Sequence, residues 1–227
     1  MRKIAVIVYG TPGSGKTTQT DLVAQKYGLI RFDTGRYIEE AINDPKNAND
    51  PMVQAQKKNY ESGLLCDRDW VHGIVSGALK RIFEAGYGVA LAGSPRSKEE
   101  AFDKDGRRGV LTMLKEEYGA DGVHIFFLNV APERSMNRNK VRKLCSVCTR
   151  QYLAEESAHL TRCPFCGGAL RTRKDDGEAI IKERFKEFET KTKVIFPGVR
   201  EMGFEIHEID GEQLPYQVFN DINRWLS

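Results

Sequence analysis

Near the amino terminus, residues 10–17 have types and spacing that suit the binding of phosphate groups. They read GTPGSGKT and match the pattern G-x-x-x-x-G-K-[ST]. In this pattern glycines let backbone N–H groups close around phosphate oxygens, Lys16 adds a positive charge, and the Thr17 hydroxyl offers a ligand for Mg²⁺. We expect a nucleoside triphosphate to contact this loop and the residue after it, namely Gly10, Pro12, Gly13, Ser14, Gly15, Lys16, Thr17 and Thr18.

The segments on either side of the loop occur in the order that such a site requires. Residues 4–9 are an apolar, β-branched run of strand length, and residues 18–27 have the pattern of a helix with Leu22 and Val23 on its buried face. The positive end of that helix would point at the phosphates. This context favours a triphosphate site over a glycine-rich turn that matches the pattern by chance.

Four of the five cysteines form two C-x-x-C pairs, separated by 14 residues. The pairs are Cys145 with Cys148 and Cys163 with Cys166. In a reducing compartment this spacing predicts a tetrahedral four-thiolate zinc site, with iron or disulfides as alternatives. Four thiolates would leave no open position on the metal, so we expect the zinc to be structural and to stabilise a segment with few apolar residues. Cys66 stands alone and is expected to be a small packing residue.

The elements that must position these groups alternate along the chain. Further strands are expected at residues 29–32, 89–92, 124–130 and 205–209, and helices at residues 70–84, 98–118, 133–143 and 177–192. Alternating strands and helices predict the α/β class, with a parallel sheet flanked by helices as in P-loop NTPases. Two insertions interrupt the pattern, at residues 33–65 and 142–173. The core is then expected to consist of residues 1–32, 66–141 and 174–227.

Composition excludes some partners. The 227-residue chain has a net charge of +3 and 40% hydrophobic residues, and its pI of about 8.5 is too mild to indicate a nucleic-acid surface. No long apolar span follows the phosphate loop, so we expect neither a membrane partner nor a secretory leader, and we expect a cytoplasmic protein.

Arginines that follow predicted elements are suited to bind phosphate oxygens in pairs. Arg96 lies in GSPRS directly after a predicted strand, and Arg138 and Arg142 lie one turn apart on a predicted helix. Arg173 and Arg184 flank an acidic pair, Asp175 and Asp176. Each alone is typical of a solvated surface charge, but together they indicate a site that moves a phosphoryl group.

In succession, GTPGSGKTTQ, DTGR, SGLLCDRDWV, GSPRS, APERSMNR, the four-cysteine segment, RKDDGEAIIKER and IDG resemble the adenylate kinase family of nucleoside monophosphate kinases, in its zinc-containing lid variant. The resemblance covers residues 4–222. It implies a parallel-sheet core, an acceptor-binding insert at residues 33–65 and a lid at residues 142–173. It also implies a monomer that reversibly transfers the γ-phosphoryl group of ATP to a nucleoside monophosphate, with Mg²⁺ as cofactor.

Carried over by position, the resemblance implies roles for individual residues. Lys16 would hold the β- and γ-phosphates, Arg138 and Arg142 the donor phosphates, and Arg173 and Arg184 the transferring group. Arg96 would contact the acceptor phosphate. The other residues implied at the acceptor are Thr34, Gly35, Arg36, Gly63, Leu65, Cys66, Gly93 and Glu100.

The chain departs from the family pattern at three acceptor-side or magnesium-side positions. Glu39 stands where an acceptor-phosphate arginine is expected, and Arg36 could supply that charge instead. Ala92 stands where the family has an aspartate that orders water on Mg²⁺, and Asp33 is a candidate substitute.

Glu100 replaces the glutamine that reads adenine. A carboxylate only accepts hydrogen bonds, and adenine N1 is also an acceptor, whereas guanine offers two donors. Glu100 therefore favours guanine, unless it points to solvent and stabilises the start of its helix.

Four other functions compete with AMP phosphorylation. One is phosphorylation of GMP or another nucleoside monophosphate, and a second is another small-metabolite kinase on the same core. A third is a regulatory homologue that binds nucleotide without turnover, favoured by Ala92 and Glu39. A fourth is a nucleic-acid-associated ATPase with a zinc module, although the cysteine segment lacks a strong basic and aromatic stripe.

Overall fold

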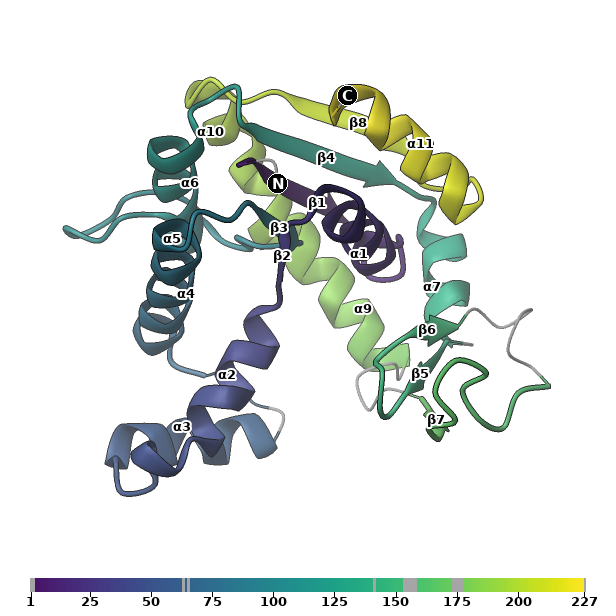
Figure 1. Cartoon of the computed structure of the whole chain (residues 1–227), viewed down its shortest axis with the longest axis horizontal. Coiled ribbons are helices and arrows are strands. Elements are labelled where there is room, and N and C mark those ends of the chain that lie inside the picture. Colours follow the sequence, from purple (N-terminus) through teal and green to yellow (C-terminus); the bar gives the residue numbers. More distant parts are fainter. Residues whose placement is uncertain are drawn as a thin grey trace.

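The computed structural model describes residues 3–62, 64, 66–140, 142–152, 159–172 and 178–226. Its centre is a five-stranded parallel sheet in the order β2-β3-β1-β4-β8 (Figure 1). The strands are β1 (Ala5–Gly10), β2 (Ile30–Phe32), β3 (Val89–Ala92), β4 (Val123–Asn129) and β8 (Ile206–Asp210). β1 lies between β3 and β4, and Val8 is in register with Ala92 on one side and with Phe126 on the other. The predicted α/β class and parallel sheet are confirmed.

Helices cover both faces of this sheet, so β1 is buried along its whole length. Val6 and Val8 face α1 (Lys16–Tyr27) and α11 (Pro215–Leu226). Ile7 and Tyr9 face the opposite layer. That layer consists of α4 (Arg68–Glu84), α5 (Lys98–Ala101), α6 (Val110–Tyr118), the segment after α9 (Glu178–Glu187), and α10 (Phe196–Glu201). The loop between β1 and α1 therefore lies at the carboxyl edge of the sheet.

The predicted helix over residues 98–118 is divided in two. Gly109 packs where an added Cβ would lie 2.3 Å from the Ala101 carbonyl oxygen, and its N–H donates to Asp103 Oδ1 at 2.8 Å. This bond turns the chain between α5 and α6. The predicted helix over residues 177–192 also ends early, since a π-helical turn at Phe188–Thr192 and a 3₁₀ turn at Lys193–Ile195 follow α9.

Residues after β2 form a helical arm on one side of the molecule (Figure 1). The arm consists of α2 (Thr34–Asn43), a 3₁₀ turn at Pro45–Asn47 and α3 (Pro51–Glu61). Three aspartate side chains accept backbone N–H groups at the starts of α2, α3 and α4, namely Asp33, Asp50 and Asp67. The arm has a small apolar core of its own, formed by Ile38, Ile42 and Val53.

The cysteine segment lies on the other side of the molecule, between α7 (Pro132–Lys140) and α9. It contains a small antiparallel sheet in the order β6-β5-β7, built from β5 (Lys143–Cys145), β6 (Gln151–Tyr152) and β7 (Leu170–Arg171) (Figure 1). Its buried residues are Cys145, Tyr152 and Cys163, so sulfur atoms replace most of the apolar core. Among the described helices, none is long and apolar enough to cross a membrane.

Candidate active site

The loop between β1 and α1 is held against α7 by a contact that only glycine permits. Gly13 has φ of 86°, and a Cβ built on it would lie 2.3 Å from the Ser135 carbonyl oxygen and 2.5 Å from Asn139 Nδ2. Gly15 has φ of 96° and directly precedes α1, so its conformation turns the chain into the helix. Backbone N–H groups at the start of α1 thereby converge on the loop.

Polar contacts fix the rest of the loop. Thr11 Oγ1 lies 3.0 Å from Ser135 Oγ, and the Ser14 N–H donates to the Thr11 carbonyl oxygen at 3.1 Å. Ser14 is buried, yet no described residue offers its hydroxyl a hydrogen-bond partner. Thr17 and Thr18 lie in the first turn of α1, where the motif requires a hydroxyl ligand for Mg²⁺. A loop of this shape, with an orphaned hydroxyl, fits a bound polyphosphate.

Lys16 is the point at which several positive charges meet. Its Nζ donates to the Thr11 carbonyl oxygen at 2.6 Å. Burial, followed by the charges of Arg96, Arg184 and Arg142, holds the pKa of Lys16 well below its ordinary value of 10.5. These arginines come from the segment after β3, from α9 and from the segment after α7. The fold therefore brings together three of the arginines predicted from the sequence, in an arrangement suited to bind an anion.

Arg96 is positioned by contacts on each side. Its Nε donates to the Gly93 carbonyl oxygen at 3.1 Å, and its own carbonyl oxygen accepts from Thr192 Oγ1 at 2.9 Å. A Cβ on Gly93 would lie 3.2 Å from Lys16 Cε, so the turn after β3 packs directly on the lysine side chain. Arg96 is thus tied to the phosphate loop on one side and to the segment after α9 on the other.

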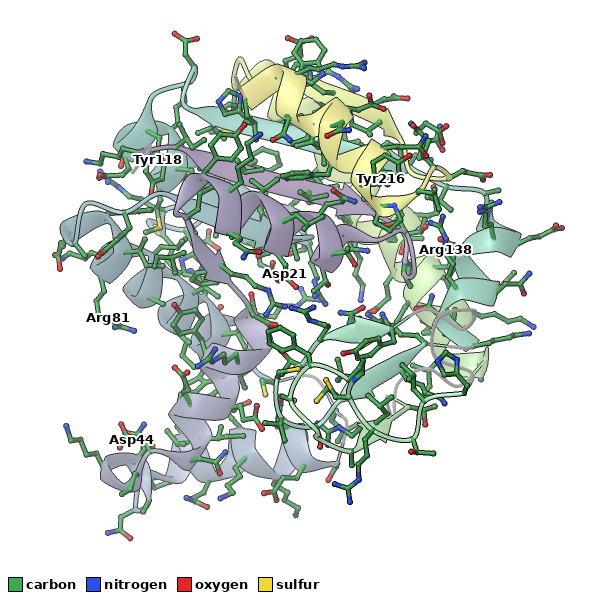
Figure 2. All side chains as sticks on the ribbon, turned by 45° about the vertical axis from the view of Figure 1, so that its right-hand side comes forward. Asp21, Asp44, Arg81, Tyr118, Arg138 and Tyr216 are labelled. Atoms are coloured by element: carbon green, nitrogen blue, oxygen red, sulfur yellow. The ribbon has the colours of Figure 1, made fainter. Side chains whose placement is uncertain are left out.

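Arg138 has a different setting from the arginines around Lys16. Its guanidinium donates to the carbonyl oxygens of Gly211 at 2.8 Å and Glu212 at 3.3 Å, in the turn after β8. Burial and the nearby Arg134 lower the pKa of Arg138. Figure 2 shows Arg138 on α7, near the end of α11 that carries Tyr216. Arg138 therefore joins α7 to the turn after β8.

At the start of the helical arm, the side chains are already engaged with one another. Asp33 Oδ1 accepts from the Gly35 N–H at 3.1 Å and Asp33 Oδ2 pairs with Arg31 at 3.3 Å. Arg36 is exposed and pairs with Glu40 at 3.1 Å. Thr34 and Gly35 form the first turn of α2. Asp33 is therefore a helix cap and an ion-pair partner, which argues against its proposed substitution for the aspartate missing at Ala92.

Cys66 packs against the core of the arm and its Sγ contacts the Gln56 carbonyl oxygen at 3.7 Å. Burial raises the pKa of this thiol. The packing supports the interpretation of Cys66 as a small structural residue.

Glu100 forms a contact that sequence reasoning left open. Its Oε2 accepts a hydrogen bond from the Arg96 N–H at 2.8 Å, while the Glu100 N–H is 3.4 Å from Ser97 Oγ. This is the reciprocal arrangement of a helix-capping box, displaced by one residue. It supports the alternative that Glu100 stabilises the start of its helix.

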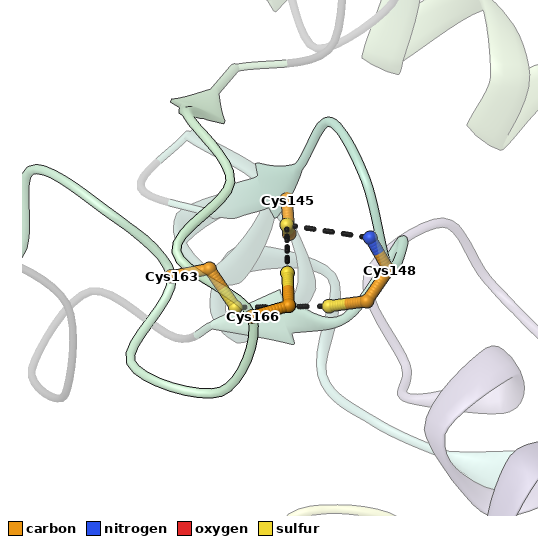
Figure 3. A group of neighbouring side chains, drawn as sticks. All are labelled: Cys145, Cys148, Cys163 and Cys166. Atoms are coloured by element: carbon orange, nitrogen blue, oxygen red, sulfur yellow. Dashed lines mark hydrogen bonds between the residues drawn. The ribbon is translucent and has the colours of Figure 1, made fainter.

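The four sulfurs of the cysteine segment lie within 4.8 Å of one another (Figure 3). Cys145 Sγ is 3.4 Å from Cys166 Sγ, Cys148 Sγ is 3.6 Å from Cys163 Sγ, and all four cysteines are free thiols. Sulfurs bound at about 2.3 Å to one tetrahedral zinc lie about 3.8 Å apart. The donor set and its spacing fit a single zinc ion, and they do not fit disulfides.

Several known proteins have sequences similar to this chain. A model of the AAA domain family matches residues 9–146, which include the phosphate loop. An adenylate kinase from Trichlorobacter lovleyi is 30% identical over 190 residues, covering 82% of this chain and 83% of that protein. Adenylate kinases from Methanothrix thermoacetophila and Kosmotoga olearia are 29% and 28% identical, and each match covers at least 96% of both chains.

The chain belongs to the adenylate kinase family. It is therefore a phosphotransferase with the nucleoside monophosphate kinase activity of that family, and its loop at residues 10–17 binds nucleotide.

Some of the expected site residues lie outside the described residues. They are Gly63, Leu65, Arg173, Asp175 and Asp176. Arg173 therefore stays a prediction for the transferring phosphoryl group, and Leu65 for the acceptor pocket.

Sequence reasoning missed one residue of the site. Tyr9 is fully buried and directly precedes the phosphate loop, and no described residue offers its hydroxyl a hydrogen-bond partner. Burial and the charge of Glu100 raise the pKa of Tyr9 well above 10.0. The signal available in the sequence is a hydroxyl at the end of an otherwise apolar strand.

Proposed function

We propose that this enzyme reversibly transfers the γ-phosphoryl group of ATP to a nucleoside monophosphate. The observation that carries the proposal is the convergence of Arg96, Arg142 and Arg184 on Lys16 beside the phosphate loop. Phosphoryl transfer spreads negative charge over the oxygens of the moving group, and fixed cations around it lower the barrier. No side chain needs to act as a covalent nucleophile, since positioning and charge suffice.

In this proposal the site has a donor half and an acceptor half. Lys16 grips the β- and γ-phosphates, and Arg142 and Arg184 meet the donor and transferring phosphoryl groups. Arg138 holds the turn after β8 next to the donor nucleotide. Arg96 meets the acceptor phosphate beside Lys16. The donor half then lies between the core and the cysteine lid at residues 142–173, and the acceptor half adjoins the arm at residues 33–65.

Two metal ions belong to the proposal. Thr17 would hold Mg²⁺ together with the phosphates, and Mg²⁺ when bound supplies charge neutralisation for the donor phosphates. Zinc would be held by Cys145, Cys148, Cys163 and Cys166, and its role would be structural because the four thiolates complete a tetrahedron. Ala92 offers no carboxylate to order the ligands of Mg²⁺, so the loop and the phosphates would have to suffice.

AMP is the acceptor that we propose first. The relatives carry the name adenylate kinase, and the bond from the Arg96 N–H to Glu100 supports a capping role for Glu100 rather than base recognition. GMP is the second candidate. It is favoured because an ionised carboxylate at this position can accept from the two donors of guanine but cannot donate to adenine N1.

The acceptor is tested by a coupled ADP-release assay with ATP and each of AMP, GMP, CMP, UMP and their deoxy forms. We expect AMP to give the highest kcat/KM, in the unmodified protein and in Glu100→Gln. A clear GMP preference that Glu100→Gln abolishes would instead assign base recognition to Glu100. Turnover with none of the acceptors, in protein that still binds ATP, would indicate the regulatory homologue. ATP hydrolysis that depends on added DNA or RNA would indicate the nucleic-acid-associated ATPase.

Acceptor-phosphate binding is tested by comparing two arginines. We expect Arg96→Ala to raise the acceptor KM strongly. Arg36→Ala should raise it only if Arg36 leaves Glu40 on binding, and an unchanged KM would remove Arg36 from the site. The family resemblance implies a monomeric enzyme. Size-exclusion chromatography with light scattering would check this.

A further inference from the structure

The four sulfurs of the proposed zinc site are unequal in their exposure to solvent. Cys145 and Cys163 are buried, with exposed fractions of 0% and 2%, and Cys148 is partly buried. Cys166 is exposed. Its loop begins at Cys163 and closes through Gly167, whose N–H donates to the Cys163 carbonyl oxygen at 2.8 Å. A reagent in solution therefore reaches the sulfur of Cys166 most easily.

The sulfurs also differ in the hydrogen bonds that they accept. Cys145 Sγ accepts from the N–H groups of Val147 and Cys148, both at 3.4 Å. Cys163 Sγ lies 3.0 Å from the Tyr152 hydroxyl and also accepts the backbone N–H groups of Phe165 and Cys166. Donors of this kind draw electron density from a thiolate and make it a weaker nucleophile.

Cys166 lacks this protection. Cys148 Sγ accepts the N–H of Arg150, but no described backbone N–H bonds to Cys166 Sγ. Two guanidinium groups also lie next to its loop. Arg150 is stacked on the Phe165 ring, 4.1 Å from the centroid, and Arg162 reaches the Gly167 carbonyl oxygen at 3.5 Å. Both guanidinium groups therefore place positive charge beside the loop of the exposed sulfur.

A second sulfur is in place to complete a reaction that begins at Cys166. Cys145 Sγ is 3.4 Å from Cys166 Sγ, which is closer than Cys148 Sγ is to Cys163 Sγ at 3.6 Å (Figure 3). We propose that Cys166 is the modification site of this lid, where peroxides and soft electrophiles react first, and that oxidation by peroxide joins Cys166 to Cys145.

The oxidation balances in two steps. The Cys166 thiolate attacks one peroxide oxygen, so an S–O bond forms, the O–O bond breaks and hydroxide leaves. The Cys145 thiolate then attacks the Cys166 sulfur, forming the S–S bond and expelling a second hydroxide. Two thiolates lose two electrons in total, and these reduce the peroxide to two hydroxides that solvent protonates.

Loss of two thiolates leaves the metal with two of its four protein ligands. Zinc is then released and the lid loses the ion that replaces its apolar core. The inference rests on the proposed zinc site, and it makes the lid a point at which oxidants stop phosphoryl transfer without touching the phosphate loop. Reducing agent and zinc together would restore the lid.

The test uses the full-length zinc-loaded protein. Zinc content is measured first, and then substoichiometric N-ethylmaleimide or hydrogen peroxide is added while a colorimetric chelator reports released zinc. Peptide mapping by mass spectrometry identifies the modified cysteine. We expect the first maleimide adduct on Cys166, and peroxide should give a Cys145–Cys166 disulfide in step with zinc release.

Two variants sharpen the test. Cys166→Asp keeps an anionic ligand for zinc but removes the exposed sulfur. Peroxide should therefore release zinc from this variant at about one tenth of the original rate, or more slowly still. Cys66→Ser removes the one cysteine outside the cluster and should leave the rate of zinc release unchanged.

The outcomes separate this inference from the proposed function. This inference alone would be overturned if the protein held one zinc per chain but was modified first at Cys145, Cys148 or Cys163. An unchanged rate of zinc release in Cys166→Asp would also overturn it. Less than one zinc per chain after refolding with zinc would overturn the zinc site and this inference with it. Kinase activity is measured separately and decides neither of these results.

Discussion

Glu100 accepts a hydrogen bond from the backbone N–H of Arg96 at 2.8 Å, so a carboxylate that was a candidate for reading the acceptor base fixes the backbone of Arg96, the proposed ligand of the acceptor phosphate. An amide oxygen can accept the same bond. We therefore expect Glu100→Gln to change the free energy of unfolding by less than about 0.5 kcal/mol, whereas Glu100→Ala lowers it by about 1 kcal/mol, as the loss of a helix cap does. Urea denaturation measures both, and equal losses in the two variants would contradict the capping role.

Replacing Lys16 should raise the stability of the free protein and lower its activity. Lys16→Met removes a charge that Arg96, Arg142 and Arg184 repel, and the Thr11 carbonyl oxygen still accepts from the Ser14 N–H. We expect the unliganded variant to be more stable to heat than the unmodified enzyme, while kcat falls by about 10²–10³-fold. Lys26→Met, on the same helix but exposed, is the control and should do neither. A less stable Lys16→Met protein would show that the cations do not repel one another appreciably.

Nucleotide binding should take up protons at alkaline pH. The pKa of Lys16 is lowered in the free protein, and a polyphosphate that balances the surrounding charges raises it again. At pH values between the lowered pKa and the ordinary 10.5, binding therefore protonates Lys16, and affinity for ATP weakens as pH rises through this window. In the same window the unfolded chain binds more protons, so the unliganded protein becomes more stable as pH rises.

Calorimetric titration with ATP in two buffers of different ionisation enthalpy measures this uptake. It should approach about one proton for each nucleotide bound. Lys16→Met should abolish it. An uptake that persists in the variant would assign the proton to another group.

Two glycines of the phosphate loop offer a matched comparison. Both Gly13 and Gly15 have positive φ, so Ala at either position introduces backbone strain of about 1–2 kcal/mol. Only at Gly13 does the new Cβ collide with α7, whereas nothing lies within 4 Å of a Cβ at Gly15. Gly13→Ala should therefore lower the free energy of unfolding by about 1–3 kcal/mol more than Gly15→Ala. Equal losses would mean that the loop moves away from α7 at little cost.

Removal of zinc should loosen the lid and leave the sheet intact. We expect chelation to increase amide hydrogen exchange at residues 143–152 and 159–171, while β1 and β4 keep their protection. Phosphoryl transfer should fall in parallel, because the lid no longer closes over the donor. Added zinc should restore both. If activity were lost while the lid amides stayed protected, the metal would have a chemical role that four thiolate ligands do not permit.

Much of this site could be predicted because its signals are local. The phosphate loop needs a strand, a glycine loop and a helix in immediate succession, and the four cysteines need only their spacing and two short turns. The α/β class followed from alternating strands and helices. Arg96 and Arg184 lie 88 positions apart, so their approach to Lys16 depends on the whole fold, and the family resemblance indicated it where periodicity could not.

Other features depended on contacts that a single sequence does not display. The break between α5 and α6 contains the Asp103 bond to the Gly109 N–H, and only the turn at Asp105 and Gly106 could be read from the sequence. The engagement of Asp33 and Glu100 as caps depends on backbone N–H groups, which every residue has. The sequence predicts Tyr9 only as part of an apolar strand. The structure adds that the charge of Glu100 acts on its hydroxyl.

The hydrogen bond from Thr192 Oγ1 to the Arg96 carbonyl oxygen joins the loop after β3 to the π-helical turn after α9. In the proposed function Arg96 meets the acceptor phosphate, and Thr192 ends the π-helical turn that continues the helix bearing Arg184. A shift of the Arg96 loop is therefore passed to one of the two helices from which the lid extends. We therefore expect occupancy of one proposed nucleotide site to change the affinity of the other, and such a coupling is reciprocal.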